Sequence, residues 1–401
     1  MLLAALVKNY TARQAILLAL VANALRPLRN RVTVIPAFFA GWLTGELAPH
    51  ILVVQAADTV NALRRRRASL LGLALGALSA AGLTVLTRRS HAVAAQIDDM
   101  LRELEVPDDT DPKTRLAVYA RPFKMSDRGV QVERNVPYTE GGRRARLDIY
   151  RPATGTIEKA PVLIQIHGGG WTIGHKAQQG LLIMNRMAAR GWVCVAANYR
   201  LAPRHRWPTQ IIDVKRAIAW VRENIAEYGG DPDYPVITGG SAGGHLSALA
   251  ALTPGEKAWQ PGFEDSDTSL AAAVPFYGVY DFTGDETYSR IMREQFLATI
   301  VFPHGATPDD FKTASPTHRI AEEVPEFLVV HGANDTLARV EQARAFVEQL
   351  RERHPGHVTY LELPGTQHAF DVFGSVRAHH TIRGVQRWLE WHRAAWLSSR
   401  E

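Results

Sequence analysis

Two glycine-rich motifs, each placed directly after an apolar run, constrain the fold of this chain more than any other feature. The sequence His-Gly-Gly-Gly-Trp occupies residues 167–171, and Gly-Gly-Ser-Ala-Gly occupies residues 239–243. The second motif lies between a strand-like and a helix-like run, which is the setting of a nucleophile elbow. In this order, the two motifs predict an α/β protein whose sheet presents a reactive serine at the end of a strand.

Ser241 is the predicted nucleophile. Only small residues flank it, as a sharp turn from strand to helix requires. The turn lifts the hydroxyl clear of the sheet and places it at a helix N-terminus, where developing negative charge is favoured. A Gly-x-Ser-x-Gly motif alone occurs by chance in many chains, so the prediction depends on the other motifs as well.

The glycine run after His167 predicts an oxyanion hole. A tetrahedral intermediate of acyl transfer carries a negative charge on oxygen, and backbone N–H groups that point inward together stabilise it. We expect the N–H groups of Gly169, Gly170 and Ala242 to be the donors. Gly168 and His167 support the loop, and His167 is expected to hold it by a hydrogen bond rather than to act as a base. A phosphate-binding glycine loop is disfavoured, because no Lys-Ser/Thr pair follows the glycines.

A serine nucleophile needs a base and a carboxylate that orients the base. Asp335 and His368 each come just after a strand-like run, so both are expected at the carboxyl edge of the sheet, where Ser241 also emerges. The chain order Ser, Asp, His is one of the known orders for such a triad. Asp371 competes for the role of the acid, but it lies only three residues from His368 and is more typical of a helix cap.

From residue 129 onward, short apolar runs alternate with helix-like segments. The strand-like runs are 130–138, 145–150, 161–167, 193–199, 235–239, 272–277, 326–331 and 358–363. The first two runs are close enough to form an antiparallel start, and the later alternation predicts parallel strands with helices on both faces. We therefore expect an eight-stranded, mostly parallel sheet. Residues 281–322 interrupt the alternation and predict a short inserted lid over the strand ends.

The net charge of +6 is unevenly distributed along the chain. Residues 1–90 hold eleven basic and two acidic side chains, a net charge of +9, and the remainder carries −3. The basic residues alternate with long apolar stretches, which indicates a membrane surface rather than a nucleic acid. The single cysteine, Cys194, excludes an intrachain disulfide, and its apolar neighbours predict a buried thiol rather than a nucleophile.

The apolar run at residues 68–87 is the best candidate for a transmembrane helix. It contains about twenty residues without a charge, which is the length that spans a hydrocarbon core. Gly72, Gly76 and Ala80 recur at the four-residue spacing that allows close helix packing in lipid. A buried, alanine-rich helix of a soluble protein is the alternative.

Two earlier apolar segments, 15–25 and 32–57, are open to several interpretations. Each could be a span, an interfacial helix or a re-entrant piece, and a secretory signal ending near residue 24 is a further alternative. Four arginines precede the run at 68–87 and two follow it, which favours a catalytic domain on the external side of the cell membrane.

Three regions are expected along the chain. Residues 1–90 form a hydrophobic, basic anchoring region, residues 91–128 a linker or cap helix, and residues 129–401 the catalytic domain. We expect the first region to be separable, so that its deletion would release a soluble and active domain.

Together these motifs resemble the hormone-sensitive-lipase-like branch of the α/β-hydrolases, which includes bacterial family IV esterases and arylacetamide deacetylase. The matching pieces lie at 167–170, 199–203, 239–244, 331–335 and 368–370. The resemblance implies an α/β-hydrolase fold and a serine carboxylesterase without a cofactor or metal. Gly240 is a departure, because many members carry an acidic residue before the serine. This departure leaves the sub-branch and its substrate open.

The leading hypothesis is a membrane-anchored carboxylesterase or lipase that acts on lipid-like or aryl esters through an acyl-enzyme. A deacetylase or amidase with the same triad is the alternative, and an inactive hydrolase fold used as a scaffold is a different class. The presence of Ser241, Asp335 and His368 together argues against the inactive fold. No motif points to a nucleic-acid partner, and the sequence specifies neither an acyl chain length nor an oligomeric state.

Overall fold

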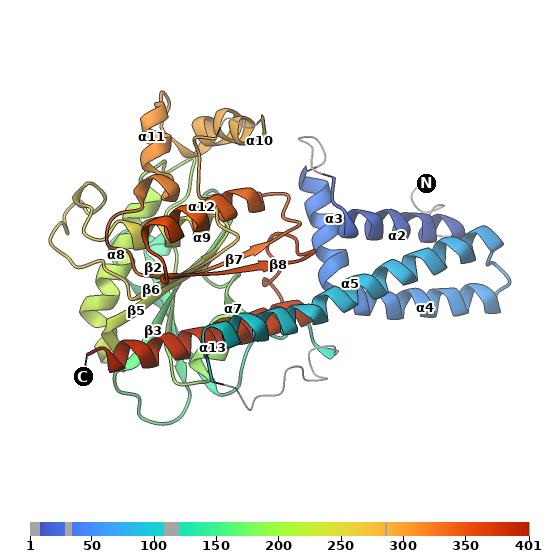
Figure 1. The fold of residues 1–401 in the computed structure, drawn as a ribbon, viewed down its shortest axis with the longest axis horizontal. Helices are drawn as coiled ribbons and strands as arrows, with labels where there is room; N and C mark the ends of the chain where they lie inside the picture. The colour runs from blue at the N-terminus through green and yellow to red at the C-terminus, as the bar shows by residue number, and fades with distance from the viewer. Residues whose placement is uncertain (1–8, 29–33, 108–119, 285–286, 401) are drawn as a thin grey trace. The chain divides into compact units, whose positions relative to one another are not determined.

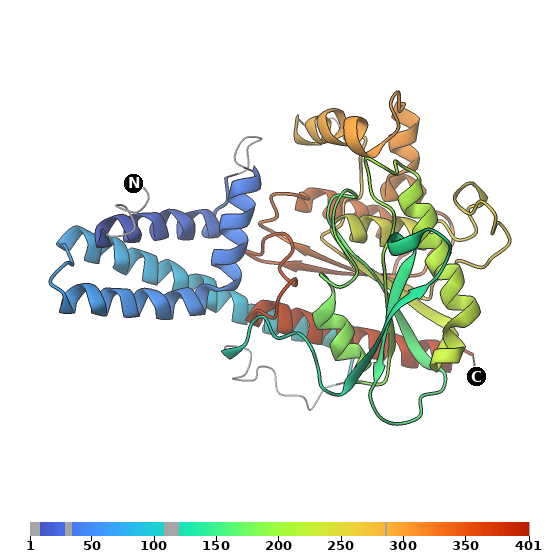
Figure 2. The same ribbon diagram turned by 180° about the vertical axis from the view of Figure 1, so that it is seen from behind.

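The computed structural model describes residues 9–28, 34–107, 120–284 and 287–400. Its contacts divide the chain into two compact units. Unit 1 comprises residues 1–124, 332–337 and 362–387, and unit 2 comprises residues 125–331, 338–361 and 388–401. Figure 1 and Figure 2 show the chain from opposite sides. Residues 332–337 and 362–387, which come late in the chain, thus belong to the same unit as the N-terminal helices.

Unit 2 is built on an eight-stranded sheet, which confirms the predicted fold class. The strands are β1 (Val130–Pro137), β2 (Arg146–Pro152), β3 (Ala160–Ile166), β4 (Val193–Ala197), β5 (Gly230–Gly240), β6 (Ala272–Phe276), β7 (Glu326–Gly332) and β8 (Val358–Leu363). Their order in the sheet is β1-β2-β4-β3-β5-β6-β7-β8. Strand β2 pairs antiparallel with β1 and β4, whereas the pairs from β4 through β3, β5 and β6 to β7 are parallel. The antiparallel start and the parallel centre both follow the sequence pattern.

Helices cover both faces of this sheet (Figure 1). The longer ones are α7 (Leu181–Ala188), α8 (Thr209–Asn224), α9 (Ala242–Leu252), α12 (Val340–Arg353) and α13 (Val376–Ser398), and short 3₁₀ turns are η1 (Gly142–Arg144), η2 (Ile225–Tyr228) and η3 (Lys257–Trp259). Helices α8 and α9 pack against β5, and α7 packs against β4. The central strands are buried on both sides, so their residues form a nearly continuous apolar run rather than an alternating one.

The insertion predicted at residues 281–322 consists of short helical pieces. They are α10 (Thr287–Ile291), the π-helical η4 (Met292–Val301), α11 (Pro308–Thr313) and the 3₁₀ turn η5 (Pro316–Arg319). A capping box between Thr307 and Asp310 begins α11. Phe282 and Phe302 are buried, and their rings contact Trp171 and Trp207 respectively. The insertion is therefore held to the rest of unit 2 by aromatic packing.

The N-terminal part of unit 1 contains four helices: α2 (Tyr10–Leu25), α3 (Val34–Glu46), α4 (Ala48–Arg64) and α5 (Leu70–Glu103). Helix α5 has 34 residues and begins at a Ser69 cap, whose hydroxyl accepts a hydrogen bond from Gly72 N. The boundary expected at residue 90 lies inside this continuous helix. No glycine or proline interrupts the chain between Gly82 and Pro107, so the backbone has no reason to stop there.

Close packing against α2 involves the small residues of α5. A Cβ atom on Gly72 would lie 2.8 Å from the Tyr10 ring, and one on Gly76 would lie 3.2 Å from the Tyr10 hydroxyl. The four-residue glycine spacing noted in the sequence thus faces a neighbouring helix. Helix α5 is the one described helix that is long and apolar enough to cross a membrane, and α3 with α4 would be a second span if that pair, bent by 82°, is counted as one.

Both polar and apolar side chains lie inside the group formed by α2, α4 and α5, and large apolar side chains also lie on its outer surface. Gln14, Gln55 and Ser79 are buried, and Gln55 Nε2 donates to Gln14 Oε1 at 3.0 Å and to the Gly76 carbonyl at 2.7 Å. Thirteen of the sixteen large apolar side chains exposed in the described part of the chain belong to residues 1–90. So many exposed apolar side chains are unusual on the surface of a water-soluble helical domain.

Candidate active site

Ser241 occupies the turn between β5 and α9. Its backbone has φ +59° and ψ −122°, a conformation that residues other than glycine rarely adopt. The Ser241 N–H donates to the Phe276 carbonyl at 3.0 Å, which ties the turn to the neighbouring strand β6. Ala242 is the first residue of α9, so its N–H lies where a helix offers no internal acceptor. The sheet thus holds a strained serine at a helix N-terminus.

The glycine loop lies directly against this turn. A Cβ atom on Gly168 would be 3.1 Å from the Ser241 Cβ, and its N–H donates to Gln179 Oε1 at 2.7 Å. Gly169 has φ +116°, and a Cβ there would lie 2.3 Å from the Ile173 carbonyl oxygen, so only glycine fits. Within the described residues, the N–H groups of Gly169 and Gly170 have no hydrogen-bond acceptor.

His167 supports the start of the loop. Its Nδ1 is 2.8 Å from the Gly168 carbonyl oxygen, and its ring stacks on Tyr199 with centroids 4.3 Å apart. The Tyr199 hydroxyl donates in turn to the His167 carbonyl at 2.9 Å. Burial lowers the pKa of His167 to about 4, so the ring is neutral at neutral pH. A neutral Nδ1–H is the form that donates to the Gly168 carbonyl.

His245, which the sequence analysis did not single out, links three parts of unit 2. It lies one helical turn after Ser241, and its Nδ1 accepts from Trp171 Nε1 at 3.2 Å. Its Nε2 donates to the Ala314 carbonyl in the insertion at 2.8 Å. Burial lowers the pKa of His245 to about 4. The only signal in the sequence was its position four residues after the serine.

We expect the folded state to lose stability as the pH falls from about 6.5 to about 4. The pKa values of His167 and His245 are both about 4, whereas an exposed histidine has a pKa near 6.5, so in this window the unfolded chain binds protons that the folded chain does not. Each ring should cost about 2 kcal/mol at pH 5 relative to pH 7. The melting temperature, measured from pH 7.5 to pH 5, should therefore fall. A His245→Asn variant, whose amide does not titrate, should show a smaller fall, and an equal fall would contradict this assignment.

Asp335 and His368 are hydrogen-bonded to each other in unit 1. His368 Nδ1 is 2.6 Å from Asp335 Oδ2, and both side chains are buried. Asp335 Oδ1 accepts from Leu337 N–H at 2.8 Å, which fixes the carboxylate. With Nδ1 donating to a carboxylate, Nε2 is the nitrogen left to act as a base.

Gln367 holds the two loops that carry this pair. Its Oε1 accepts from the Thr336 N–H at 2.8 Å and from the His368 N–H at 2.9 Å. Helix α3 contributes Phe38, whose ring lies edge-on to the His368 imidazole with centroids 6.0 Å apart. An aromatic ring from the N-terminal helices therefore limits the positions that the imidazole can take.

A buried ion pair joins the end of α3 to the segment that follows His368. The Glu46 carboxylate accepts from the Ser375 hydroxyl at 2.6 Å and pairs with the Arg377 guanidinium. Ser375 in turn caps the start of α13 by accepting from Ala378 N at 3.0 Å. These contacts argue against the expectation that residues 1–90 are a separable anchor, because they help to build the segment that carries His368.

The residues expected in the site thus meet in two groups. Ser241 and Ala242 meet the loop at 167–170 in unit 2, and Asp335 meets His368 in unit 1. Cys194 is fully buried in β4 and burial raises the pKa of its thiol, which confirms the prediction of a packed cysteine.

The glycine before the nucleophile has a steric explanation. A Cβ atom on Gly240 would lie 2.5 Å from the Tyr277 hydroxyl and 2.8 Å from the ring. An acidic side chain at this position, as in many members of the resembled branch, would collide with Tyr277. The close approach of Tyr277 therefore explains why glycine stands before the serine in this chain.

Comparisons with known proteins agree with this architecture. The model of the BD-FAE family matches residues 147–350. A protein named "Probable carboxylic ester hydrolase LipM" from Mycobacterium tuberculosis is 43% identical over 392 residues, which cover 94% of this chain and 91% of the relative. "Esterase LipQ" from the same organism is 48% identical over 258 residues, or 64% of this chain and 61% of the relative. The solved structure of the esterase Est2 from Thermogutta terrifontis has a TM-score of 0.55 and 27% identity over 67% of this chain and 93% of its own.

The sheet order and the serine turn at the end of β5 are those of an α/β-hydrolase. The chain belongs to the BD-FAE family, within the hormone-sensitive-lipase-like branch of that fold.

Proposed function

We propose that this chain is a serine hydrolase of carboxylic esters in which Ser241, His368 and Asp335 form the catalytic triad. Three relatives that are 40%, 43% and 48% identical carry the names of esterases or carboxylic ester hydrolases. The observation that carries the assignment of residues is the strained Ser241 turn packed against a glycine loop with two unpaired N–H groups. That combination serves acyl transfer and has no purpose in a scaffold.

In the first half of the reaction, Ser241 Oγ attacks the ester carbonyl carbon while His368 Nε2 accepts the hydroxyl proton. Asp335 holds the imidazole in the required tautomer through the 2.6 Å hydrogen bond and stabilises the imidazolium that forms. His368 then gives the proton to the departing alcohol, which leaves an acyl-enzyme on Ser241. A water molecule, activated in the same way by His368, releases the acid.

The N–H groups of Gly169, Gly170 and Ala242 stabilise the oxyanion in both tetrahedral intermediates. Gly168 does not donate, since its N–H already serves Gln179 Oε1. Because the glycine loop is fixed by His167, Tyr199 and Trp171 before the substrate arrives, the donors need no reorganisation during the reaction. One such donor contributes about 3 kcal/mol to the stabilisation of a transition state.

Residues 281–322 form the lid over the acyl-binding side of the glycine loop. A Cβ atom on Gly170 would lie 3.4 Å from the Phe296 ring of η4, so this aromatic side chain covers the loop. Phe282 and Trp171 add an apolar wall with ring centroids 5.6 Å apart. An apolar wall beside the oxyanion donors fits the acyl or aryl part of a lipid-like or aryl ester.

The N-terminal helices anchor the protein in a membrane. Their apolar outer surface suits a hydrocarbon environment, where the buried Gln14 and Gln55 find hydrogen-bond partners only in the interior. Val53, Leu70 and Leu71 are more than 60% exposed, which would be costly in water over so large a surface. This placement also brings the enzyme to lipid substrates.

A panel of p-nitrophenyl esters from acetyl to palmitoyl, assayed with the purified full-length protein, tests the function. We expect hydrolysis of esters and covalent labelling of Ser241 by an organophosphonate probe, with a preference for longer acyl chains because of the apolar wall. Labelling at another residue would exclude the nucleophile assignment. If matched anilides were hydrolysed and the esters were not, the protein would be an amidase rather than an esterase.

A further inference from the structure

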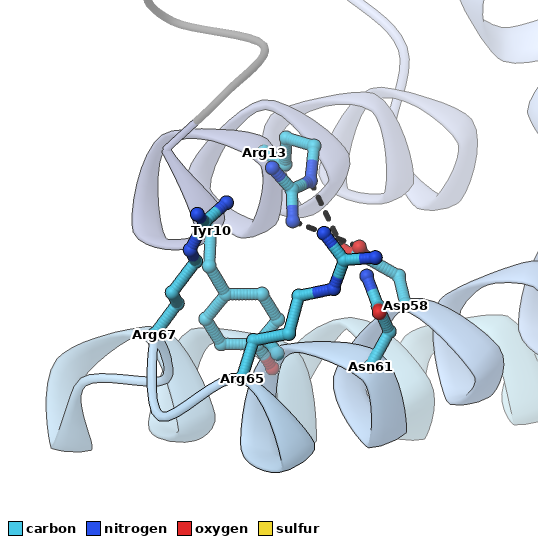
Figure 3. A pocket seen from close by; sticks show the side chains of 7 residues that line it. Tyr10, Arg13, Asp58, Asn61, Arg65 and Arg67 are labelled. Atoms are coloured by element: carbon cyan, nitrogen blue, oxygen red, sulfur yellow. Dashed lines mark hydrogen bonds and ion pairs between the residues drawn. The ribbon is translucent and has the colours of Figure 1, made fainter.

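The turn between α4 and α5 borders a cavity of about 230 Å³ (Figure 3). It belongs to unit 1 and contains none of the residues assigned above to ester hydrolysis. Its walls come from the start of α2, the end of α4 and the turn itself. The lining residues are Tyr10, Arg13, Asp58, Asn61, Ala62, Arg65 and Arg67.

The one acidic residue of the cavity is already neutralised. Arg13 binds Asp58 with two guanidinium nitrogens, Nε at 3.1 Å from Oδ2 and Nη2 at 2.8 Å from Oδ1. Gln14 Nε2 also donates to Asp58 Oδ2 at 3.2 Å. The Asp58 carboxylate is thus paired with Arg13, and the lining side chains together carry a net charge of +2.

Arg65 and Arg67 have no partner among the described residues. Neither guanidinium forms a hydrogen bond or an ion pair there, and Figure 3 shows their side chains extending from the turn toward Tyr10 and Asn61. The backbone of the turn is fixed, because Arg65 N–H donates to the Asn61 carbonyl and Arg67 N–H to the Ala62 carbonyl. Two exposed cationic side chains thus border the cavity, on either side of the Tyr10 ring in Figure 3, and neither has an anionic partner among the described residues.

The position of the cavity indicates where its ligand comes from. The apolar part of α5 begins three residues after Arg67, and Leu70 and Leu71 are 88% and 63% exposed. If these leucines contact hydrocarbon, as proposed above, the cavity lies at the level of the phospholipid headgroups. A phosphate with two guanidinium partners is the anion that arginine geometry fits best in that layer.

We propose that this cavity binds the phosphate of an anionic phospholipid headgroup through Arg65 and Arg67. The lipid source rests on the proposed membrane anchoring, whereas the phosphate site itself does not. Arg64 and Arg66 belong to the same turn but do not line the cavity, so they add positive charge without contacting the ligand.

Isothermal titration of the full-length protein in detergent with dioctanoyl phosphatidylglycerol tests this proposal. The double variant Arg65→Gln/Arg67→Gln should bind at least about tenfold more weakly, because each guanidinium supplies a charge-assisted hydrogen bond. The matched control Arg64→Gln/Arg66→Gln removes the same charge from the same turn and should change the affinity by less than about threefold. Equal losses in both variants, or no loss in either, would overturn the site.

Two further titrations separate the sources of the phosphate. If inorganic phosphate binds as tightly as phosphatidylglycerol and depends on Arg65 and Arg67, the site stands but its ligand is a free anion, which overturns the lipid source. If inorganic phosphate binds at least tenfold more weakly, the lipid headgroup is supported. Insertion of the protein into neutral phosphatidylcholine vesicles tests the anchoring separately, and circular dichroism of each variant shows whether the helices remain folded.

Discussion

Replacing Ser241 with alanine is expected to lower kcat for ester hydrolysis by about 10⁴-fold or more. The substitution removes the atom that attacks the carbonyl carbon, and no neighbouring residue can take its place. An alanine methyl group fits where the serine hydroxymethyl group lay, so the melting temperature should stay within a few degrees of the wild-type value. Steady-state kinetics with p-nitrophenyl butyrate, together with thermal unfolding, measure both effects.

Ser247 provides the matched control for this substitution. It lies six residues further along the same chain segment, inside α9, and its buried hydroxyl has no hydrogen-bond partner among the described residues. Ser247→Ala should therefore leave both activity and stability nearly unchanged. If Ser241→Ala retained more than about one-tenth of the wild-type kcat, the triad assignment would be wrong.

The eight strands could be predicted because each is defined by residues that are adjacent in the sequence. Each is a short apolar run bounded by turn residues, and the alternation with helical segments determines the parallel arrangement. The turn at Ser241 could be predicted equally well, since the glycines around it indicate a sharp turn of the backbone. The residue types alone thus predict the backbone that surrounds the nucleophile.

Contacts between distant segments could not be predicted in this way. The hydrogen bonds of His245 with Trp171 and Ala314 depend on how three elements meet, and no spacing in the sequence reports that. The start of α7 is a smaller example. The spacing of residues 176–190 predicts a helix over that whole range, but Gly180 adopts φ +68° beside the Gln165 side chain, so the helix begins at Leu181.

The division of the chain into two units could not be predicted either, because it also depends on contacts between distant segments. Residues 1–90 differ in composition from the rest, which suggested an independent anchor. In the structure, Asn334 Nδ2 donates to the Leu25 carbonyl and Gln96 Nε2 donates to the Glu362 carbonyl, so the N-terminal helices share a compact unit with the loops of Asp335 and His368. The composition of a segment indicates whether its environment is polar or apolar, but it does not identify the residues that the segment packs against.

Glu46→Gln is expected to destabilise the protein and to impair catalysis, because Glu46 joins α3 to the segment that carries His368. The variant removes the charged partner of the buried Arg377 guanidinium, which costs about 3–5 kcal/mol. A loss of that size should lower the melting temperature by roughly 5 °C. Because the same carboxylate holds Ser375 at the start of α13, the segment that carries His368 should loosen, and kcat should fall more than KM rises.

Asp99→Asn is the matched control for Glu46→Gln, because it makes the same chemical change in the same unit. Asp99 pairs with Arg102 on the surface, where both side chains are at least 60% exposed, so its loss should cost less than about 1 kcal/mol. If Glu46→Gln behaved like this control, the N-terminal helices would be a separable anchor after all, and a protein lacking residues 1–90 should be soluble and active. We expect instead that such a truncation destroys activity, since it removes Glu46, Phe38 and Trp42, side chains through which α3 contacts the His368 segment.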